Sequence, residues 1–198
     1  MKITAIRQQV KRPDRYSIYV DEAFAFGLSE SALLETGLFV GQELDKPRLD
    51  ELQATAGRDK LFGNALRFAA MRPRSRWEIQ NYLQRKDSTE YADYVILRLE
   101  RAGLLNDLEF ARAWVANRRL LRSTSKRKLQ MELQQKRVPS DIIDEVLAED
   151  DTTDQTALQQ LIAKKRSRYP DQQKLMAYLA RQGFGYDDIK QALAEETE

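Results

Sequence analysis

Residues 1–28 alternate between apolar and polar positions, and this period of two is typical of β-strands. Turn-forming stretches interrupt the alternation at residues 11–15 and 21–22. The pattern predicts a small antiparallel hairpin or meander, followed by a short helix that Ser29 caps and Gly37 ends. The alternating apolar positions are Ile3, Ala5, Tyr16, Ile18, Val20, Phe24 and Phe26.

From about residue 58 the apolar positions follow helical spacing, and the same arrangement occurs three times. In each copy two aliphatic residues lie four positions apart, which places them on one face of a helix. The second members of the pairs are separated by 50 and 46 residues. The pairs are Ile79 with Leu83, Leu129 with Leu133, and Leu175 with Leu179.

Helix start signals divide each copy into three helices. Ser75 with Glu78 has capping-box spacing, and the third helix of that copy is expected to run from about Ser88 to Ala102. Asp45, two residues before a proline, is a further candidate cap. The other expected starts are Asn106, Ser125, Pro139-Ser140, Thr153 and Pro170.

The predicted fold is therefore mainly α: three tandem three-helix repeats form an elongated, solenoid-like molecule after a small β-meander and helix. The expected boundaries are 1–57 for the N-terminal unit, then 58–106, 107–151 and 152–198 for the repeats. Stacked repeats present a continuous surface, which is typical of proteins that bind an extended partner.

Composition limits the chemistry that the chain can perform. The 198 residues include no Cys and no His, which excludes disulfides, a Ser-His-Asp triad and the usual zinc ligands. The glycine pair Gly57 and Gly63 has the wrong spacing for a nucleotide-binding loop, and Asn64 stands where such a loop has lysine. We therefore expect no enzymatic activity, no cofactor and no metal.

Nothing in the sequence indicates a membrane protein. No run approaches the roughly 20 apolar residues of a membrane-spanning helix, and residues 1–20 lack the apolar segment of a signal peptide. The sequence predicts a cytoplasmic monomer.

Charge is segregated along the chain, although the formal net charge is only +2. The stretch from Arg112 to Val138 carries a net +8, and the stretch from Asp141 to Asp154 carries −7. Two interpretations remain open: opposed patches that steer a charged partner, or solvated helix faces with local ion pairs.

Three basic clusters are candidate contacts with a partner or with DNA. The central cluster spans a helix junction of the second repeat; we expect it to be solvated, while Leu120, Leu121 and Leu129 hold the helices in place. A second cluster lies at a helix start, where guanidinium groups suit phosphate or carboxylate partners. The candidates are Arg118, Arg119, Arg122, Lys126, Arg127 and Lys128; Arg72, Arg74 and Arg76; and Lys164, Lys165 and Arg166.

Several motifs resemble the RecX family of recombinase regulators. They are Arg-Pro-Arg-Ser-x-x-Glu-Ile at 72–79, Gly-Leu-Leu-Asn-Asp-x-x-Phe-Ala at 103–111, and Gly-Phe-Gly-Tyr-Asp-Asp-Ile at 183–189. The resemblance spans roughly residues 58–196, and Tyr-x-Ile-x-Val-Asp-Glu at 16–22 is similar to the hairpin of longer members. Two departures concern turns: Arg137 stands where the family usually has glycine, and Ser123-Thr124-Ser125 replaces a glycine-containing turn.

The resemblance implies a non-enzymatic protein that binds the RecA–DNA filament along its groove. It also implies inhibition of recombinase, ATPase and LexA co-protease activities, with roles in DNA repair, homologous recombination and the SOS response. The resemblance leaves open whether single- or double-stranded DNA is a further direct partner.

Other functions remain compatible with the residues alone. A stand-alone DNA- or RNA-binding helical-repeat protein would use the same basic clusters on phosphate backbones. A ribonucleoprotein scaffold and an enzyme that relies on carboxylates with Tyr or Lys are further alternatives.

Overall fold

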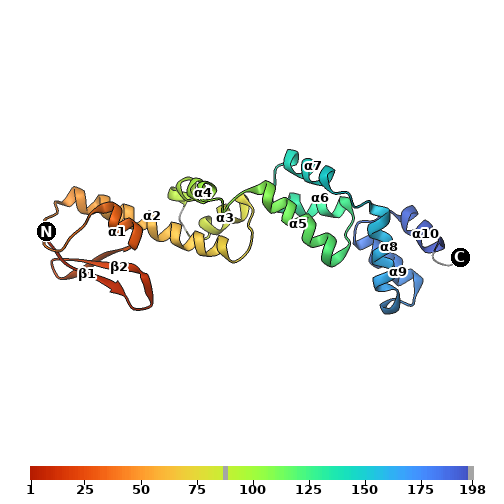
Figure 1. Ribbon diagram of the computed structural model, residues 1–198, viewed down its shortest axis with the longest axis horizontal. Helices are drawn as coiled ribbons and strands as arrows, with labels where there is room; N and C mark the ends of the chain where they lie inside the picture. Colours follow the sequence, from red (N-terminus) through yellow and green to blue (C-terminus); the bar gives the residue numbers. More distant parts are fainter. Residues whose placement is uncertain (87–88, 196–198) are drawn as a thin grey trace. The chain divides into compact units, whose positions relative to one another are not determined.

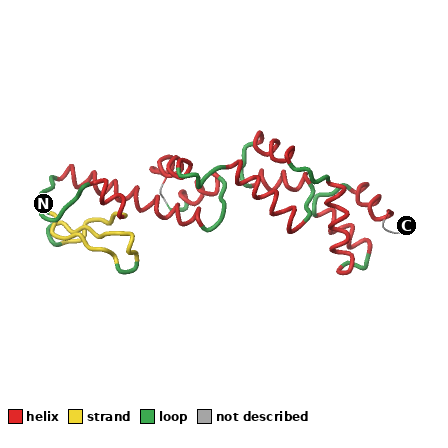
Figure 2. Tube along the Cα trace, in the orientation of Figure 1, coloured by secondary structure: helices red, strands yellow, loops and turns green. Residues whose placement is uncertain are grey.

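The computed structural model describes residues 1–86 and 89–195, which form mostly helices and one small antiparallel sheet (Figures 1 and 2). The predicted fold class is thus confirmed in its helical character and its N-terminal strands. The chain divides into two compact units. The first contains residues 1–72 and 79–104, and the second contains residues 73–78 and the chain from Leu105 onward.

The three strands form a meander in which β1 (Ile3–Gln9), β2 (Arg12–Val20) and β3 (Ala23–Ser29) pair in sequence order. The turn between β2 and β3 places Asp21 and Glu22 at positive φ, as tight hairpin turns require. Alternate side chains of the sheet enter the core, as the period of two predicted, but Phe24 does not: it lies beside an irregularity in the pairing of β2 with β3 and is exposed. The buried ones include Ile3, Ile18, Val20, Phe26 and Leu28.

Two helices follow the sheet. Helix α1 (Glu30–Thr36) begins after Ser29, whose hydroxyl accepts from the backbone N–H of Ala32, and it ends at Gly37 in the left-handed conformation. Both ends agree with the predicted caps. Helix α2 (Lys46–Ala70) is capped by Asp45 and has Pro47 in its first turn.

Helix α2 runs without a break through the expected domain boundary between residues 57 and 58. Its first half buries Leu49 and Leu52 against the sheet, and its second half buries Leu61 and Ala65. One helix therefore serves both the N-terminal unit and the first repeat. Glycine weakens a helix interior by only about 1 kcal/mol, so Gly57 does not end it.

The remaining helices complete the three repeats. In the first repeat the expected start near Ser88 lies outside the described residues; in the other two, Asn106, Ser125 and Thr153 cap helices as predicted. Pro139 precedes a helix as expected, whereas Asp171 rather than Pro170 caps α9. The elements are α3 (Arg76–Gln84), η1 (Thr89–Tyr91) and α4 (Ala92–Arg101); α5 (Asp107–Arg122), α6 (Lys126–Gln135) and α7 (Ser140–Glu149); and α8 (Asp154–Lys165), η2 (Arg166–Arg168), α9 (Gln172–Arg181) and α10 (Tyr186–Glu195).

The repeated aliphatic pairs form the cores of these repeats. All six pair members are buried, with exposed fractions of 0%. In the third repeat Leu175 and Leu179 pack in one cluster with Phe184 and Ile189. The four-residue spacing thus identified the inward face of the second helix in every copy.

Candidate binding surface in the second unit

The central basic cluster lies where α5 ends, the chain turns through residues 123–125, and α6 begins. The turn is buried, and Ser123 adopts the left-handed conformation with φ of 47°. Arg137, the other departure from the family pattern, also has positive φ, at 54°. Both turns therefore keep the backbone conformation that glycine adopts most easily.

Contrary to the expectation of a solvated cluster, Arg119 does not face solvent, because its side chain lies under the turn. Its Nε and Nη2 atoms donate to Asp150 Oδ2 at 2.8 and 2.6 Å, and the two side chains are only 11% and 8% exposed. Further bonds go to the carbonyl oxygens of Thr124 and Thr152. Arg119 thus fixes the end of α5 to the segment after α7.

Two lysines of α6 bind the carboxyl ends of neighbouring helices. Lys126 Nζ donates to the carbonyl oxygens of Leu147 and Asp150 at 3.1 and 2.9 Å. Lys128 Nζ donates to the carbonyl oxygen of Arg181 at 2.7 Å. A cation at this end of a helix satisfies free carbonyls and complements the helix dipole.

Arg118 packs over the ring of Trp114, with its guanidinium carbon 4.5 Å from the ring centroid. Its Nε donates to Glu132 Oε2 at 2.6 Å, and the same oxygen accepts from Trp114 Nε1 at 2.9 Å. This group joins α5 to α6. The expectation of a solvated cluster is therefore wrong for Arg118, Arg119, Lys126 and Lys128.

The expectation that Leu120 and Leu121 hold the helices together is also wrong. Their exposed fractions are 79% and 57%, whereas Leu129 is fully buried as predicted. The reason is helical spacing: Ala111, Val115 and Arg119 lie four residues apart on the inward face, so the leucines point outward.

Arg122 and Arg127 are the members of the cluster that remain exposed. Within the part of the chain that the structure describes, neither makes an ion pair or a side-chain hydrogen bond. Leu120 and Leu121 are exposed just before the same turn, and we call these four residues the apolar-basic tip. Lys164 Nζ, which donates to the carbonyl oxygen of Leu121 at 3.3 Å, holds this end of α5 against α8.

The other basic candidates are divided by the structure. Arg72 belongs to the first unit, whereas Arg74 and Arg76 belong to the second. Arg72 and Arg76 are exposed, and Arg74 is half-buried. At the end of α8, Lys164 is exposed, while Lys165 and Arg166 are half-buried.

The capping serines of α3 and α6 occupy equivalent positions and make equivalent contacts. Ser75 Oγ donates to the carbonyl oxygen of Lys136 at 2.9 Å, and Ser125 Oγ donates to that of Gln182 at 3.1 Å. Each serine also accepts from a backbone N–H of its own helix, as the predicted caps require. Each serine therefore caps the start of its own helix and also hydrogen-bonds to the following repeat.

A second pair of contacts repeats in the same way. The backbone N–H of Arg76 donates to Asp107 Oδ1 at 2.7 Å, and that of Lys126 donates to Asp154 Oδ1 at 2.7 Å. An aspartate at the start of each following repeat thus satisfies an open N–H of the preceding helix. The helix starts were predictable from the sequence, whereas these contacts between repeats leave no local pattern in it.

Gly183 lies at the second of these junctions, with φ of +93°. A Cβ atom there would overlap Ser125 Oγ and would lie 2.9 Å from Lys128 Cβ. We expect Gly183→Ala to lower the free energy of unfolding by about 2–4 kcal/mol, which combines close packing and left-handed strain. Denaturant unfolding followed by circular dichroism measures the loss.

Gly103→Ala is the matched control for this substitution. Gly103 also follows a helix with positive φ, but a Cβ there would meet nothing within 4 Å. It should lose only about 1–2 kcal/mol, from strain alone. Equal losses at the two positions would show that the repeats do not approach each other closely at Gly183.

The acidic stretch after residue 138 is largely engaged by the basic stretch before it. Arg112 binds Glu109, Glu145 and Glu149, with the shortest contact, to Glu149, at 2.7 Å. Hydrogen bonds to Glu149 first, and then to Glu109, raise the pKa of Arg112, and the bond from Arg112 lowers the pKa of Glu149. Together with the Asp150 contacts of Arg119, these pairs favour local ion pairing over two opposed patches.

Two classes of site find no support in the described residues. Among them, no group of three or more Asp or Glu side chains is arranged to hold a metal ion. Gly57 and Gly63 both lie inside α2 rather than in a loop. Within the same residues, no helix combines the length and the apolar character needed to cross a membrane.

Comparisons with known proteins assign most of the chain to domains of one family. Residues 1–45 match the regulatory protein RecX N-terminal domain. Residues 106–147 match the second three-helix domain of RecX, and residues 152–193 match the third. The second and third matches coincide with the last two helical repeats described above.

Two curated relatives and one solved structure resemble nearly the whole chain, and a second solved structure resembles 70% of it. The regulatory protein RecX of Bacillus pumilus (strain SAFR-032) is 31% identical, with 98% of this chain and 76% of that protein covered. The protein of the same name from Bacillus subtilis (strain 168) is 33% identical over 96% of this chain and 75% of its own length. A crystal structure of regulatory protein RecX matches with a TM-score of 0.74 at 24% identity over 98% of both chains. A structure of RecX from Lactobacillus salivarius gives 0.58 at 24% identity, covering 70% of this chain and 96% of its own.

Proposed function

This chain belongs to the RecX family of regulatory proteins, and on that premise we propose that it binds the RecA–DNA filament and inhibits it. Inhibition would extend to the recombinase, ATPase and LexA co-protease activities of the filament, and the chain would act as a non-enzymatic cytoplasmic monomer. Contact along the filament groove would bring the helical repeats to neighbouring RecA protomers.

The observation that supports a protein partner is the apolar-basic tip. Leu120 and Leu121 expose most of their side chains, and Arg122 and Arg127 lie on either side of the buried turn. Exposed leucines beside unpaired guanidinium groups suit an acidic protein surface with an apolar recess. The turn is held by Arg119 and Lys164, so little ordering entropy would oppose binding.

A stand-alone nucleic-acid binder is the second candidate, and the exposed basic residues favour it. Arg122 and Arg127 would neutralise phosphates, but Leu120 and Leu121 have no role on a phosphate backbone. The salt dependence separates the two candidates. Naked duplex binding should follow a slope of about −0.9 per neutralised phosphate, whereas filament binding includes apolar contacts that salt does not screen.

The test is co-sedimentation of the full chain with ATP-bound RecA filaments on single-stranded DNA. Leu120→Ser with Leu121→Ser should weaken filament binding by at least about tenfold, because central apolar anchors dominate interfaces. Arg122→Glu with Arg127→Glu should slow association and weaken binding most at low salt. Because all four side chains are exposed or unpaired, the melting temperature should hardly change.

Matched controls come from exposed residues of the same unit. Met131→Ser removes an apolar side chain that is 50% exposed on α6, and Lys190→Glu reverses an exposed charge on α10. Both should bind like the unmodified chain. Binding of the leucine variant at full strength would reject the tip as the contact, and failure of the unmodified chain to co-sediment would reject the proposed function.

A further inference from the structure

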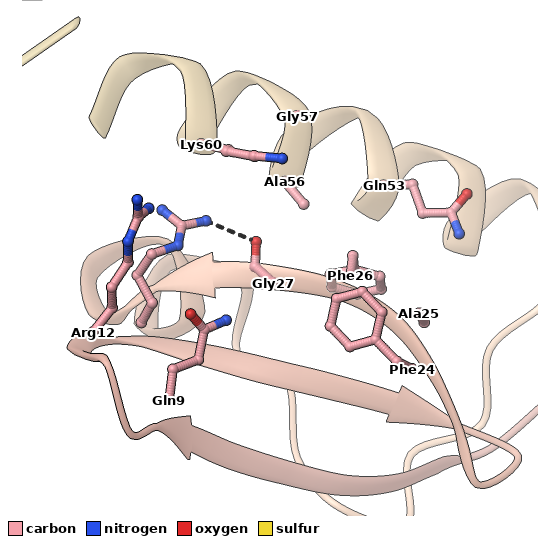
Figure 3. A pocket seen from close by; sticks show the side chains of 11 residues that line it. Gln9, Arg12, Phe24, Ala25, Phe26, Gly27, Gln53, Ala56, Gly57 and Lys60 are labelled. Atoms are coloured by element: carbon pink, nitrogen blue, oxygen red, sulfur yellow. Dashed lines mark hydrogen bonds between the residues drawn. The ribbon is translucent and has the colours of Figure 1, made fainter. Parts of the chain in front are cut away.

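A groove lies in the first unit between the β-sheet and α2, far in sequence from the apolar-basic tip. It encloses about 490 Å³ and is lined by residues of all three strands and of α2. Figure 3 shows Arg12 and Lys60 toward one end of the groove, and Phe24 and Gln53 toward the other. The volume falls within the range of natural ligand sites.

The first end of the groove is positively charged. No acidic residue is among those that line it. Arg15 also lines it but is neutralised by Asp59, with a 3.0 Å contact. Arg12 and Lys60 are exposed, and within residues 1–86 and 89–195 neither has an ion-pair partner. Two unpaired cations at this end of the groove would attract a ligand that carries more than one negative charge.

The second end offers a flat aromatic face. Phe24 is 61% exposed although it belongs to a strand, and its ring lies nearly perpendicular to that of Tyr19, with 6.1 Å between the centroids. The exposed part of the Phe24 ring is available for stacking. The amide of Gln53 is exposed beside it and can both donate and accept hydrogen bonds.

Small residues keep the space between the two ends open. The groove includes Ala56 and Gly57 on α2, and a Cβ atom at Gly57 would meet nothing within 4 Å. Lys60 and Gln53 are seven residues apart, so their backbones lie about 10 Å apart along α2. That length corresponds to about three stacked nucleotides.

We infer that this groove binds a short segment of single-stranded nucleic acid, with phosphates at Arg12 and Lys60 and a base stacked on Phe24. Proteins that hold single strands without sequence preference combine a basic track with aromatic platforms in this way. An acidic peptide would use the two cations, but it would leave the exposed ring and the amide without a role. The inference concerns naked single strands and does not depend on binding to a RecA filament.

A second hollow supports a path for the phosphate backbone. It encloses about 570 Å³, shares Arg12 with the groove, and adds Lys11 and Arg67. Although Asp14 also lines it, the basic side chains outnumber the acidic ones that are not already paired. The phosphate backbone of a bound single strand could therefore continue past Arg12 and lie beside further cations.

The test is fluorescence anisotropy of a labelled oligothymidylate with the full-length protein, measured across a range of salt concentrations. Arg12→Glu with Lys60→Glu should reduce the salt slope by about 1.4, which is the contribution of two phosphate contacts on a single strand. Phe24→Ala should weaken binding by about fivefold to a hundredfold and leave the slope unchanged. Hydrogen exchange of the strand amides verifies that the first unit remains folded in each variant.

Lys2→Glu with Arg101→Glu is the matched control, because both residues are exposed cations of the first unit that do not line the groove. This variant should keep most of the affinity. Equal losses in the control and in the Arg12 and Lys60 variant would overturn the inference, as would full affinity in the Phe24 variant. A labelled oligoglutamate that binds through Arg12 and Lys60, while oligothymidylate does not, would also overturn it and assign the groove to acidic peptides.

Discussion

Replacing Asp59 by alanine is expected to lower the free energy of unfolding of the first unit by about 3–5 kcal/mol. Asp59 and Arg15 form an ion pair at 3.0 Å with side chains only 8% and 7% exposed. The carboxylate also accepts from the backbone N–H and the hydroxyl of Ser29 at 2.8 and 2.5 Å. Its removal leaves a buried guanidinium without a counter-charge and removes one of the contacts between α2 and the sheet. Hydrogen exchange of the strand amides measures the loss.

Asp50→Ala is the matched control on the same helix. Asp50 pairs with Lys46 at 2.5 Å, but the aspartate side chain is 53% exposed. Exposed pairs contribute about 0.2–1 kcal/mol, so the control should be nearly silent. Both tryptophans, Trp77 and Trp114, belong to the second unit, so their fluorescence follows that unit separately. Comparable losses in the two variants would contradict a structural role for the buried pair.

The features that the sequence predicted correctly are those set by neighbours along the chain. Ser75 and Glu78 form the expected capping box, because both members lie within one helical turn. The aliphatic pairs four residues apart are buried in every repeat for the same reason. Local spacing is enough to place a helix and its inward face.

The expected boundary between residues 57 and 58 is wrong because one unbroken helix crosses it. Asp45 begins α2 as expected, and the helical spacing from about residue 58 continues the same helix. The ion pair of Asp59 with Arg15, which links the middle of α2 to the sheet, joins residues that are 44 positions apart in the sequence. A contact of that separation leaves no local pattern.

The candidate site shows the same limit more sharply. The basic residues were correctly located at a helix junction, but their partners could not be read from composition. Asp150 lies 31 residues after Arg119, and Arg181 lies 53 residues after Lys128. One local signal was available: Arg119 continues the four-residue series of Ala111 and Val115, which marks it as inward-facing and leaves Leu120 outside.

Arg119→Ala should therefore destabilise the second unit by about 3–5 kcal/mol, whereas Arg122→Ala, three residues away on the same helix, should cost less than about 0.5 kcal/mol. The first variant leaves the Asp150 carboxylate nearly buried without its cation, and it removes the donors to the carbonyl oxygens of Thr124 in the turn and of Thr152 after α7. Arg122 is exposed, and its loss should weaken filament binding instead. Denaturant unfolding followed by tryptophan fluorescence measures the stability of both variants, and co-sedimentation measures their binding. If neither alanine variant changes the free energy of unfolding and both weaken filament binding, then the whole cluster faces the partner and the structural role assigned to Arg119 is wrong.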